Sequence, residues 1–521
     1  MKLNTKRTVL VGLAFFLISA FWQMYDSIIP LLLTNKFGMS QTWSGAIMAL
    51  DNVLAVFMLP LFGALSDKCF GNRYGKRKPF VAIGTIVAVI ALVGLTFVDS
   101  AQLKNIEQIS KVDDPAALTV IYDTQAEKEL LTPEGEKFVL SEKFTKEEFV
   151  EIRTTSEDFV ASEGETIKGY NYTNYVSPAR QAYAADATDE SPTMLIVFIG
   201  LLLIVLVSMA TFRSPAVALM PDVTVKPLRS KANAIINLMG TAGGILVLVL
   251  GMVFATSSPK NALMSYTTFC CVVAAVMIGA LVIFLLTVRE KAWSKQMQED
   301  SVRLGIEEKE ADNTNKGKKL SKAEFRSLIF ILLSIALWYF GYNAITSKYA
   351  VYAGNILQKD YNTTLLIAQA AAIVSYLPAG MIASKIGRKK TILAGVALLA
   401  IAFGSASVMR ANSPTWLMNV LFSMAGIAWA SINVNSFPMV VEMCSGGDIG
   451  KYTGFYYTAS MSAQIATPVL SGFLMDNMGM TVLFPYAGLF VAGSFVTMCF
   501  VKHGDNKVAS KKGLDAFDVE D

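Results

Sequence analysis

The sequence is dominated by long apolar runs that alternate with short polar segments. Twelve of these runs hold about 20 or more mostly apolar residues, enough for a helix to cross the hydrocarbon core of a bilayer. Backbone groups in lipid must pair with one another, so such runs fold as helices. The sequence therefore predicts an all-α membrane protein with twelve transmembrane helices. The predicted spans are 8–33, 43–66, 79–98, 193–220, 232–255, 262–288, 327–350, 364–384, 391–409, 416–440, 453–475 and 481–501.

Composition excludes several other classes of protein. Only 17% of the 521 residues are charged, against about 25% in soluble domains. The five cysteines have no metal-ligand or disulfide-framework spacing, so we expect neither a zinc site nor a disulfide scaffold. No nucleophile–base set or phosphate-binding loop is present, so we expect no enzyme, cofactor or catalytic residue. The single histidine, His503, follows the last apolar run, so proton chemistry inside the membrane would depend on carboxylates.

The positions of Lys and Arg predict the orientation of the chain. If the N-terminus is cytoplasmic, the cytoplasmic segments hold 30 of the 45 basic residues, as the positive-inside rule requires. Both termini are then cytoplasmic, and the net charge of +4 reflects topology and not nucleic-acid binding. The first apolar run continues to Leu33, too long for a signal peptide, so we interpret it as a retained helix. We expect a multi-pass protein of the plasma (inner) membrane.

Two long polar segments divide the chain. Residues 99–192 hold 20 acidic and 9 basic residues, and short alternating segments within them predict a small, β-rich extracytoplasmic domain. Residues 289–326 are highly charged and predict a cytoplasmic linker between two six-helix halves. The expected organisation is 1–98 (helices one to three), 99–192 (inserted domain), 193–288 (helices four to six), 289–326 (linker), 327–501 (helices seven to twelve) and 502–521 (cytoplasmic tail).

An internal repeat supports the division into halves. The basic segment Gly75–Lys78 precedes the third span, and Gly387–Lys390 precedes the ninth, an offset of 312 residues. Asp222–Lys231 matches Glu442–Lys451 at an offset of 220 residues. The offsets differ by 92, nearly the length of 99–192, so we interpret that segment as an insertion into the first of two duplicated halves. Parallel six-helix repeats are typical of major facilitator transporters.

Only four charged side chains lie inside the predicted spans: Asp26, Asp51, Arg213 and Lys348. A charge at the bilayer centre costs at least about 2.5–3.5 kcal/mol, so such residues are usually functional. Asp26 and Asp51 both fall about 10–12 Å below the outer surface on adjoining helices, at 1.5 Å per residue. Two carboxylates at matching depth can hold a shared proton, so we expect them to couple transport to protons. Alternatively, each bonds only to a neighbouring helix.

Polar and aromatic side chains in the spans are candidates for substrate contact. Trp22 and Gln23 lie one turn before Asp26 and share its helix face. An aromatic plate beside an amide and a carboxylate is suited to a sugar, which can stack on the ring while its hydroxyls are hydrogen-bonded. Packing between helices is the competing interpretation for each residue. The remaining candidates for substrate binding are Trp338, Tyr342, Asn343, Asn433 and Gln464.

Other charged residues are candidates for gates. Lys348 lies near the outer end of its span, where it can snorkel to the headgroups or pair with an acid as a gate. Arg213 can pair with Asp222, with the inner end of the second helix, or with the headgroups. In the turn after the second span, Asp67 can bond to a facing helix N-terminus or to an arginine and hold the cytoplasmic side shut. The basic residues of that turn include Arg73 and Arg77.

The segment Pro60–Phe80, with the pattern P-x-x-G-x-x-S-D-K-C-x-x-x-R-x-G-K-R-K-P-F, resembles the loop between helices two and three of plant-type sucrose transporters and their relatives. These belong to the glycoside–pentoside–hexuronide cation symporter branch of the major facilitators. Arg213 with Asp222, and then Arg229–Ala234, resemble the region of helices four and five, and Ser27–Pro30 loosely resembles the first helix.

The resemblance covers about residues 8–98 and 193–501, and 99–192 is foreign to the family's pattern. It implies a major facilitator fold and proton-coupled uptake of a sugar or glycoside. Asp51 has no counterpart in the sucrose transporters, and the melibiose-type branch has its acids at the positions of Ala55 and Leu59. The role of Asp51 is therefore an inference from depth alone.

The sequence supports one leading function and two alternatives. The first is a monomeric symporter that moves a sugar with protons, or with sodium, by alternating access. The second is an exporter or antiporter of another small solute, which two intramembrane acids would serve equally well. The third is a membrane sensor or scaffold that uses the 99–192 domain, although twelve spans exceed what an anchor needs.

Overall fold

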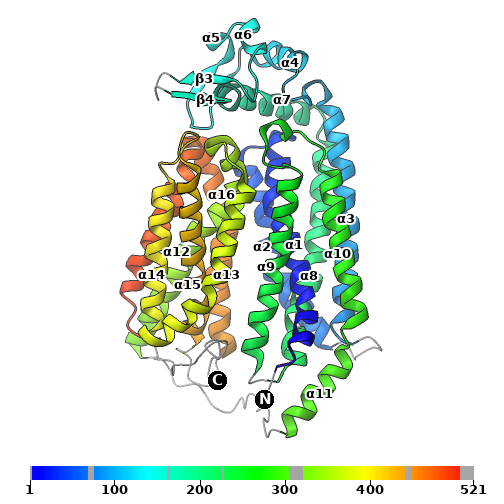
Figure 1. Cartoon of the computed structure of the whole chain (residues 1–521), viewed down its shortest axis with the longest axis vertical. Coiled ribbons are helices and arrows are strands. Elements are labelled where there is room, and N and C mark those ends of the chain that lie inside the picture. Colours follow the sequence, from blue (N-terminus) through cyan, green and yellow to red (C-terminus); the bar gives the residue numbers. More distant parts are fainter. Residues whose placement is uncertain are drawn as a thin grey trace.

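In the described part of the chain, twelve long helices form the body of the protein (Figure 1). The computed structural model describes residues 3–68, 75–160, 165–225, 228–303, 321–441, 443 and 449–504. Each long helix coincides with one predicted span. The helices are α1 (Thr5–Asn35), α2 (Gln41–Lys68), α3 (Lys78–Asn105), α8 (Thr193–Val223), α9 (Arg229–Val253), α10 (Thr267–Thr287), α12 (Lys322–Tyr352), α13 (Tyr361–Ile386), α14 (Arg388–Ala406), α15 (Thr415–Val441), α16 (Ile449–Met478) and α17 (Leu483–Cys499).

Eleven of these helices, within the described residues, are long and apolar enough to cross a bilayer. The twelfth, α16, is 30 residues long but more polar, and it lies in the bundle between α2 and α12. Large apolar side chains are exposed on the outer faces of the helices, such as Ile90, Ile196 and Leu286. Exposed apolar surface over the length of a helix suits lipid as the solvent. The chain is therefore a multi-pass membrane protein.

The helices pack into two groups, each with its own apolar core. One core joins α1, α2, α3, α8, α9 and α10, which we call the N half. The other joins helices α12 to α17, which we call the C half. Figure 1 shows the two groups side by side. They meet where α2 packs against α16, α1 against α12 and α9 against α13. The two cores are distinct except for Leu31 of α1, which belongs to the core of the C half.

A compact segment, residues 106–192, covers one end of the bundle, and we call it the cap (Figure 1). Its own core includes Leu118, Phe138 and Phe149. The prediction of a β-rich domain is wrong for the described part of this segment, where β structure is confined to two antiparallel pairs of strands with three or four residues each. The elements are η1 (Glu107–Ile109), α4 (Pro115–Gln125), β1 (Glu129–Leu131), β2 (Lys137–Val139), α5 (Leu140–Lys143), α6 (Lys146–Val150), β3 (Glu157–Val160), β4 (Glu165–Lys168), η2 (Tyr172–Val176) and α7 (Ser177–Glu190).

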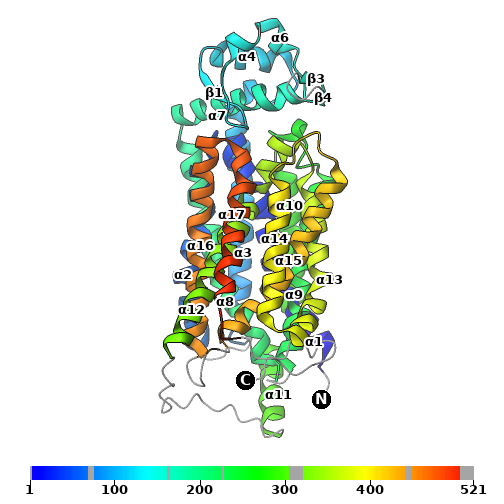
Figure 2. The same cartoon turned by 90° about the vertical axis from the view of Figure 1, so that its left-hand side faces the viewer.

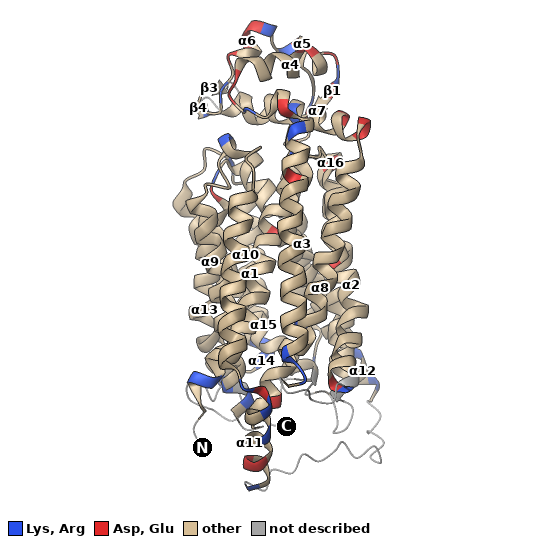
Figure 3. Cartoon of the chain, turned by 90° about the vertical axis from the view of Figure 1, so that its right-hand side faces the viewer, with Lys and Arg blue, Asp and Glu red and all other residues tan. Residues whose placement is uncertain are grey.

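Charged side chains gather at the two ends of the molecule. Figure 3 shows acidic and basic residues over the cap, basic residues at the opposite end, and few charges between them. We call that opposite end the basic end. Helix α11 (Glu290–Arg303) extends from it (Figure 2), and Arg7 of α1 contacts α11 through Gln296 and Trp293. The middle of the molecule, which holds few charges, is the zone in which a charged side chain would cost most free energy in lipid.

A buried ion pair ties the cap end of the N half together. Lys36, directly after α1, is 0% exposed, and its Nζ bonds to the carboxylate of Asp99 on α3, which is 2% exposed. Lys36 also donates to the carbonyl oxygen of Met264 at 2.7 Å, and Asp99 accepts from the backbone N–H of Tyr266 at 3.1 Å. The two charges therefore connect α1, α3 and the segment before α10.

We predict that Lys36→Met lowers stability by about 3–5 kcal/mol, because it leaves the carboxylate of Asp99 buried without its charge partner. Thermal unfolding of purified protein in detergent measures the effect. Lys128→Met is the matched control: its pair with Asp186 is about half exposed, so the loss should stay below about 1 kcal/mol. The double variant Lys36→Met, Asp99→Leu should recover much of the loss. Equal effects of the two single variants would contradict the prediction.

Candidate functional site

The two predicted intramembrane acids lie near one another where the N half faces the C half. Asp26 of α1 and Asp51 of α2 are half-buried, and their carboxylates are within electrostatic range of each other. Asp51 accepts a hydrogen bond from Asn52 Nδ2 at 2.6 Å. The guanidinium of Arg213 on α8 is also within electrostatic range of Asp51 and lies 5.6 Å from the ring of Trp22. The structure thus gathers two acids, one base and an aromatic ring from three helices.

Arg213 does not bind Asp222, one of the partners proposed from sequence. Asp222 accepts a hydrogen bond from Arg77 instead, and Arg213 is directed toward Trp22 and Asp51. The helix places Arg213 about two turns before Asp222, too far along the axis for a pair. An arginine that neighbours one of two close carboxylates gives them different surroundings, which is how paired acids acquire different proton affinities.

The C half contributes an aromatic platform to the same region. Tyr342 of α12 stacks on Trp429 of α15, with ring centroids 3.6 Å apart and planes 5° from parallel. Tyr339 meets the edge of Trp429 at 5.5 Å. Tyr342 and Trp429 are half-buried, and Tyr342 is within electrostatic range of Asp26 across the interface. A flat, partly accessible stack beside a carboxylate can support the apolar face of a ring-shaped ligand.

A direct hydrogen bond joins the halves beside the acids. Gln369 Nε2 of α13 donates to Gln23 Oε1 of α1 at 2.5 Å, and Gln23 Nε2 donates to Ser27 Oγ at 3.0 Å. Gly244 of α9 permits the approach, because a Cβ there would lie 3.2 Å from Gln369 Oε1. The sequence analysis missed Gln369. Its signal was an amide inside a predicted span, where polar side chains need partners.

The other predicted substrate residues have different surroundings. Trp338 is only 1% exposed within the core of the C half, and its assignment to substrate contact stays a prediction. Asn343 Nδ2 donates to the carbonyl oxygen of Tyr339 in its own helix at 2.9 Å. Asn433 is exposed on α15 and Gln464 is half-buried on α16. Both remain candidates for contact with a ligand.

Lys348 does not snorkel to a headgroup region. It is 0% exposed, and its Nζ donates to the carbonyl oxygen of Gln41, the first residue of α2, at 2.5 Å. Asp476 of α16 caps the same helix end, accepting from the backbone N–H groups of Gln41 and Thr42 at 2.8 Å each. The gate alternative for Lys348 is thus the one with structural support. Asp476, which sequence reasoning missed, is the acid at this contact.

At the basic end, Arg77 connects the last turn of α2 with the end of α8. Its Nη2 donates to Asp67 at 2.5 Å, its Nε donates to Asp222 at 2.8 Å, and its Nη1 donates to Ser66. Burial alone would lower the pKa of Arg77, but Asp222 and Asp67 raise it overall. These partners all belong to the N half, so this cluster does not bridge the halves. Arg73 lies outside the described residues.

We predict that Arg77→Lys lowers stability by about 2–3 kcal/mol, because one ammonium cannot replace hydrogen bonds from three different nitrogens to three residues. Asp67 is 64% exposed, so most of the loss comes from Asp222 and Ser66. The thermal midpoint in detergent measures it. The neighbouring exposed residue provides the control: Lys76→Met should leave the midpoint unchanged. An unchanged midpoint for Arg77→Lys would refute the role of the cluster.

Comparison with solved structures identifies the fold class. The chain superposes on the inward-open xylose transporter XylE from E. coli with a TM-score of 0.58 and 14% identity, covering 96% of both chains. A D-xylose-proton symporter gives a TM-score of 0.55 at 15% identity, covering 96% of this chain and 98% of that one. A POT family transporter in complex with 5-aminolevulinic acid gives 0.58 at 10% identity, covering 95% of each. At these identities the likeness shows the fold alone.

Sequence comparison relates two segments of the chain to known transporter families. Residues 10–102 match a model described as "MFS/sugar transport protein", and residues 355–516 match one described as "Major Facilitator Superfamily". MFS-type transporter ppzB of Metarhizium rileyi is 25% identical and that of Metarhizium majus 26% identical over 135 residues, or 26% of this chain. Those matches span only 27% and 29% of the relatives' own lengths. Two segments of the chain are therefore similar to Major Facilitator Superfamily transporters, and the fold is like that of the solved xylose transporter.

Proposed function

We propose that the protein is a secondary active transporter that moves a sugar or glycoside with protons by alternating access. The observation that carries the proposal is the convergence of two carboxylates with an aromatic stack where the halves meet. Asp26 and Asp51 come from the N half, and Tyr342 and Trp429 come from the C half. A ligand held between them would contact both halves, so its binding would respond to their relative movement.

The proton and the sugar have different binding groups in this proposal. The carboxylates of Asp26 and Asp51 are the proton carriers, because like charges at close range favour a shared proton. The Tyr342–Trp429 stack and the Gln23–Gln369 amides hold the ring and its hydroxyls, respectively. Arg213 sets the difference between the two acids. The sequence matches to a sugar-transport model and the fold shared with a D-xylose-proton symporter support this choice.

Several finer assignments belong to the same proposal. The halves are two six-helix repeats, with the cap inserted into the first. The protein is a monomer in the plasma membrane with both termini and the basic end cytoplasmic, consistent with the basic residues there (Figure 3). An exporter or antiporter of another small solute would use the same acids. Transport measured in right-side-out and inside-out vesicles distinguishes the two directions.

We predict that Asp26→Asn and Asp51→Asn each abolish sugar accumulation driven by a pH gradient, because neither amide can carry a proton. Purified protein in proteoliposomes, labelled disaccharide and an imposed gradient with and without an uncoupler measure this. Exchange of sugar across the membrane should persist in the Asp26→Asn variant, since exchange needs no net proton movement. Asp114→Asn in the cap is the control and should transport normally. If sugar accumulation by the unmodified protein depends neither on the pH gradient nor on the uncoupler, proton coupling is refuted.

We predict that Trp429→Ala raises the half-saturating sugar concentration about three- to tenfold, as expected for loss of an aromatic stacking contact. Initial uptake rates over a range of sugar concentrations measure it. Trp416→Ala is the matched control, because Trp416 is on the same helix but 66% exposed at its start. Equal effects of the two substitutions would show that the Tyr342–Trp429 stack does not bind the sugar.

A further inference from the structure

The cap is attached to the N half through buried contacts. Gln102 of α3 is 0% exposed, and its Nε2 donates to the carbonyl oxygen of Lys36 at 2.9 Å and to Thr188 Oγ1 of α7 at 3.2 Å. Gln181 Nε2 of α7 donates to Asn35 Oδ1 at the end of α1 at 3.2 Å. These contacts join the cap to both α1 and α3.

Packing strengthens the attachment to the N half. Leu263, from the segment between α9 and α10, belongs to the apolar core of the cap. Gly38 has a φ of +64°, and a Cβ there would lie 2.2 Å from the backbone nitrogen of Ala185 in α7. No side chain fits between the α1–α2 turn and α7, so the two backbones are in direct contact. The cap and the N half therefore form one rigid unit.

The cap reaches the C half through the tips of its loops. The backbone N–H of Met480 donates to the carbonyl oxygen of Pro133 at 2.7 Å. Arg410 Nε lies 3.3 Å from Glu134 Oε1, and both side chains are partly exposed. Gln358 Nε2 donates to Thr173 Oγ1 at 2.8 Å. These contacts are separate, and among the described residues no cap side chain belongs to the core of the C half.

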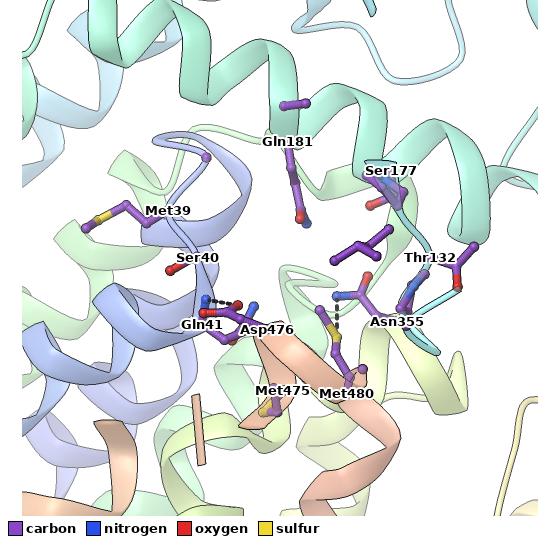
Figure 4. Close-up of a pocket in the computed structure, with 17 residues that line it drawn as sticks. Met39, Ser40, Gln41, Thr132, Ser177, Gln181, Asn355, Met475, Asp476 and Met480 are labelled. Carbon is purple, nitrogen blue, oxygen red and sulfur yellow. Dashed lines mark hydrogen bonds between the residues drawn. The ribbon is translucent and has the colours of Figure 1, made fainter. Parts of the chain in front are cut away.

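Two glycines permit the closest of these contacts. Gly135 of the cap has a φ of +92° and Gly479, after α16, has a φ of +87°. A Cβ on Gly479 would lie 2.2 Å from the carbonyl oxygen of Glu134. A pocket of about 220 Å³ lies beside this contact. Figure 4 shows its lining side chains coming from the cap, the α1–α2 turn and the C half, with Gln181 on one side and Asn355 and Met480 on another.

Contacts between the helices close the same end of the bundle. Asp476 caps α2, Lys348 bonds to Gln41, and Ser257 Oγ donates to Asp360 Oδ1 at 2.7 Å. Among residues that the structure describes in both halves, the hydrogen bonds between the halves lie at the cap end or beside Gln23. Opening of this end would require all of these contacts to break together with those of the cap.

We propose that the cap is a gate element that moves with the N half and grips the C half only when the cap end is closed. By adding contacts to that state alone, it shifts the conformational equilibrium toward the conformation open at the basic end. The proposal rests on the alternating-access movement proposed above but not on the identity of the substrate. It assigns to the inserted segment a function in transport itself.

A disulfide between cap and C half tests the gate. The experiment uses full-length protein with the five native cysteines replaced by serine. The substitutions Pro133→Cys and Met480→Cys then place two thiols at the contact between the cap and the C half. Oxidation should stop transport and reduction should restore it. The control pair Asn35→Cys and Gln181→Cys cross-links the cap to the N half and should leave transport intact. Transport that continues after the first cross-link, or stops after the second, would overturn the proposal.

Distance measurements test the movement without any substrate. In the same cysteine-free background and in lipid nanodiscs, spin labels at Lys143 and Val408 report on cap and C half, and labels at Lys143 and Lys260 report on cap and N half. We expect two distances for the first pair and one for the second. A single distance for the first pair, or two for the second, would overturn the proposal. Two distances without sugar uptake would instead refute the proposed substrate and leave the gate standing.

Charge reversal tests the contribution of the Glu134–Arg410 pair. Glu134→Arg should raise the ratio of long to short Lys143–Val408 distances about two- to fivefold, as expected for loss of a partly exposed ion pair. Adding Arg410→Glu should return the ratio toward its starting value. Glu136→Arg, two residues away, is the matched control and should not change the ratio. Equal effects of Glu134→Arg and Glu136→Arg would show that the Glu134–Arg410 pair does not contribute to the gate.

Discussion

The hydrocarbon core of a bilayer offers no hydrogen-bond partner, and the architecture depends on this constraint. Each span must pair its own backbone groups, so the chain crosses as helices. Each polar side chain inside must find a partner within the protein or a ligand. Two such partnerships are the hydrogen bonds between Asp51 and Asn52 and between Gln23 and Gln369. The residues that lipid tolerates least are consequently gathered where the halves meet.

The same constraint separates contacts that hold each half together from contacts that cross between the halves. Lys36 with Asp99 and Arg77 with Asp222 are buried or half-buried pairs inside the N half. Other hydrogen-bonded contacts cross between the halves. Asp476 of α16 accepts from the backbone at the start of α2, and Lys348 donates to the carbonyl oxygen of Gln41. These crossing bonds use helix ends, where unpaired backbone groups are available without cost to the helix interior. A helix end can therefore serve as a reversible contact in a moving protein.

The sequence predicted the features that depend on helix length and periodicity. It did not predict the surroundings of side chains that depend on residues distant in the sequence. Trp338 and Tyr342 are one helical turn apart, and both looked like ligand contacts. One is buried in the core of the C half, whereas the other stacks on Trp429 at the interface. Lys348 near a helix end suggested a headgroup contact, but α2 covers it and supplies a carbonyl. In the cap, short alternating segments suggested strands, whereas tertiary packing favoured helices such as α4 and α7.

The sequence by itself determined the membrane helices and the rarity of charges within them, because span length and the cost of a buried charge are local properties. It also located Asp26 and Asp51 at one depth, because helical rise converts position into distance. The tertiary structure decided which side of each helix meets the other half. It brought Tyr342 beside Asp26, joined Gln369 to Gln23, and set the tips of the cap on the C half. Such pairings join residues up to hundreds of positions apart, and only the packing of whole helices fixes them.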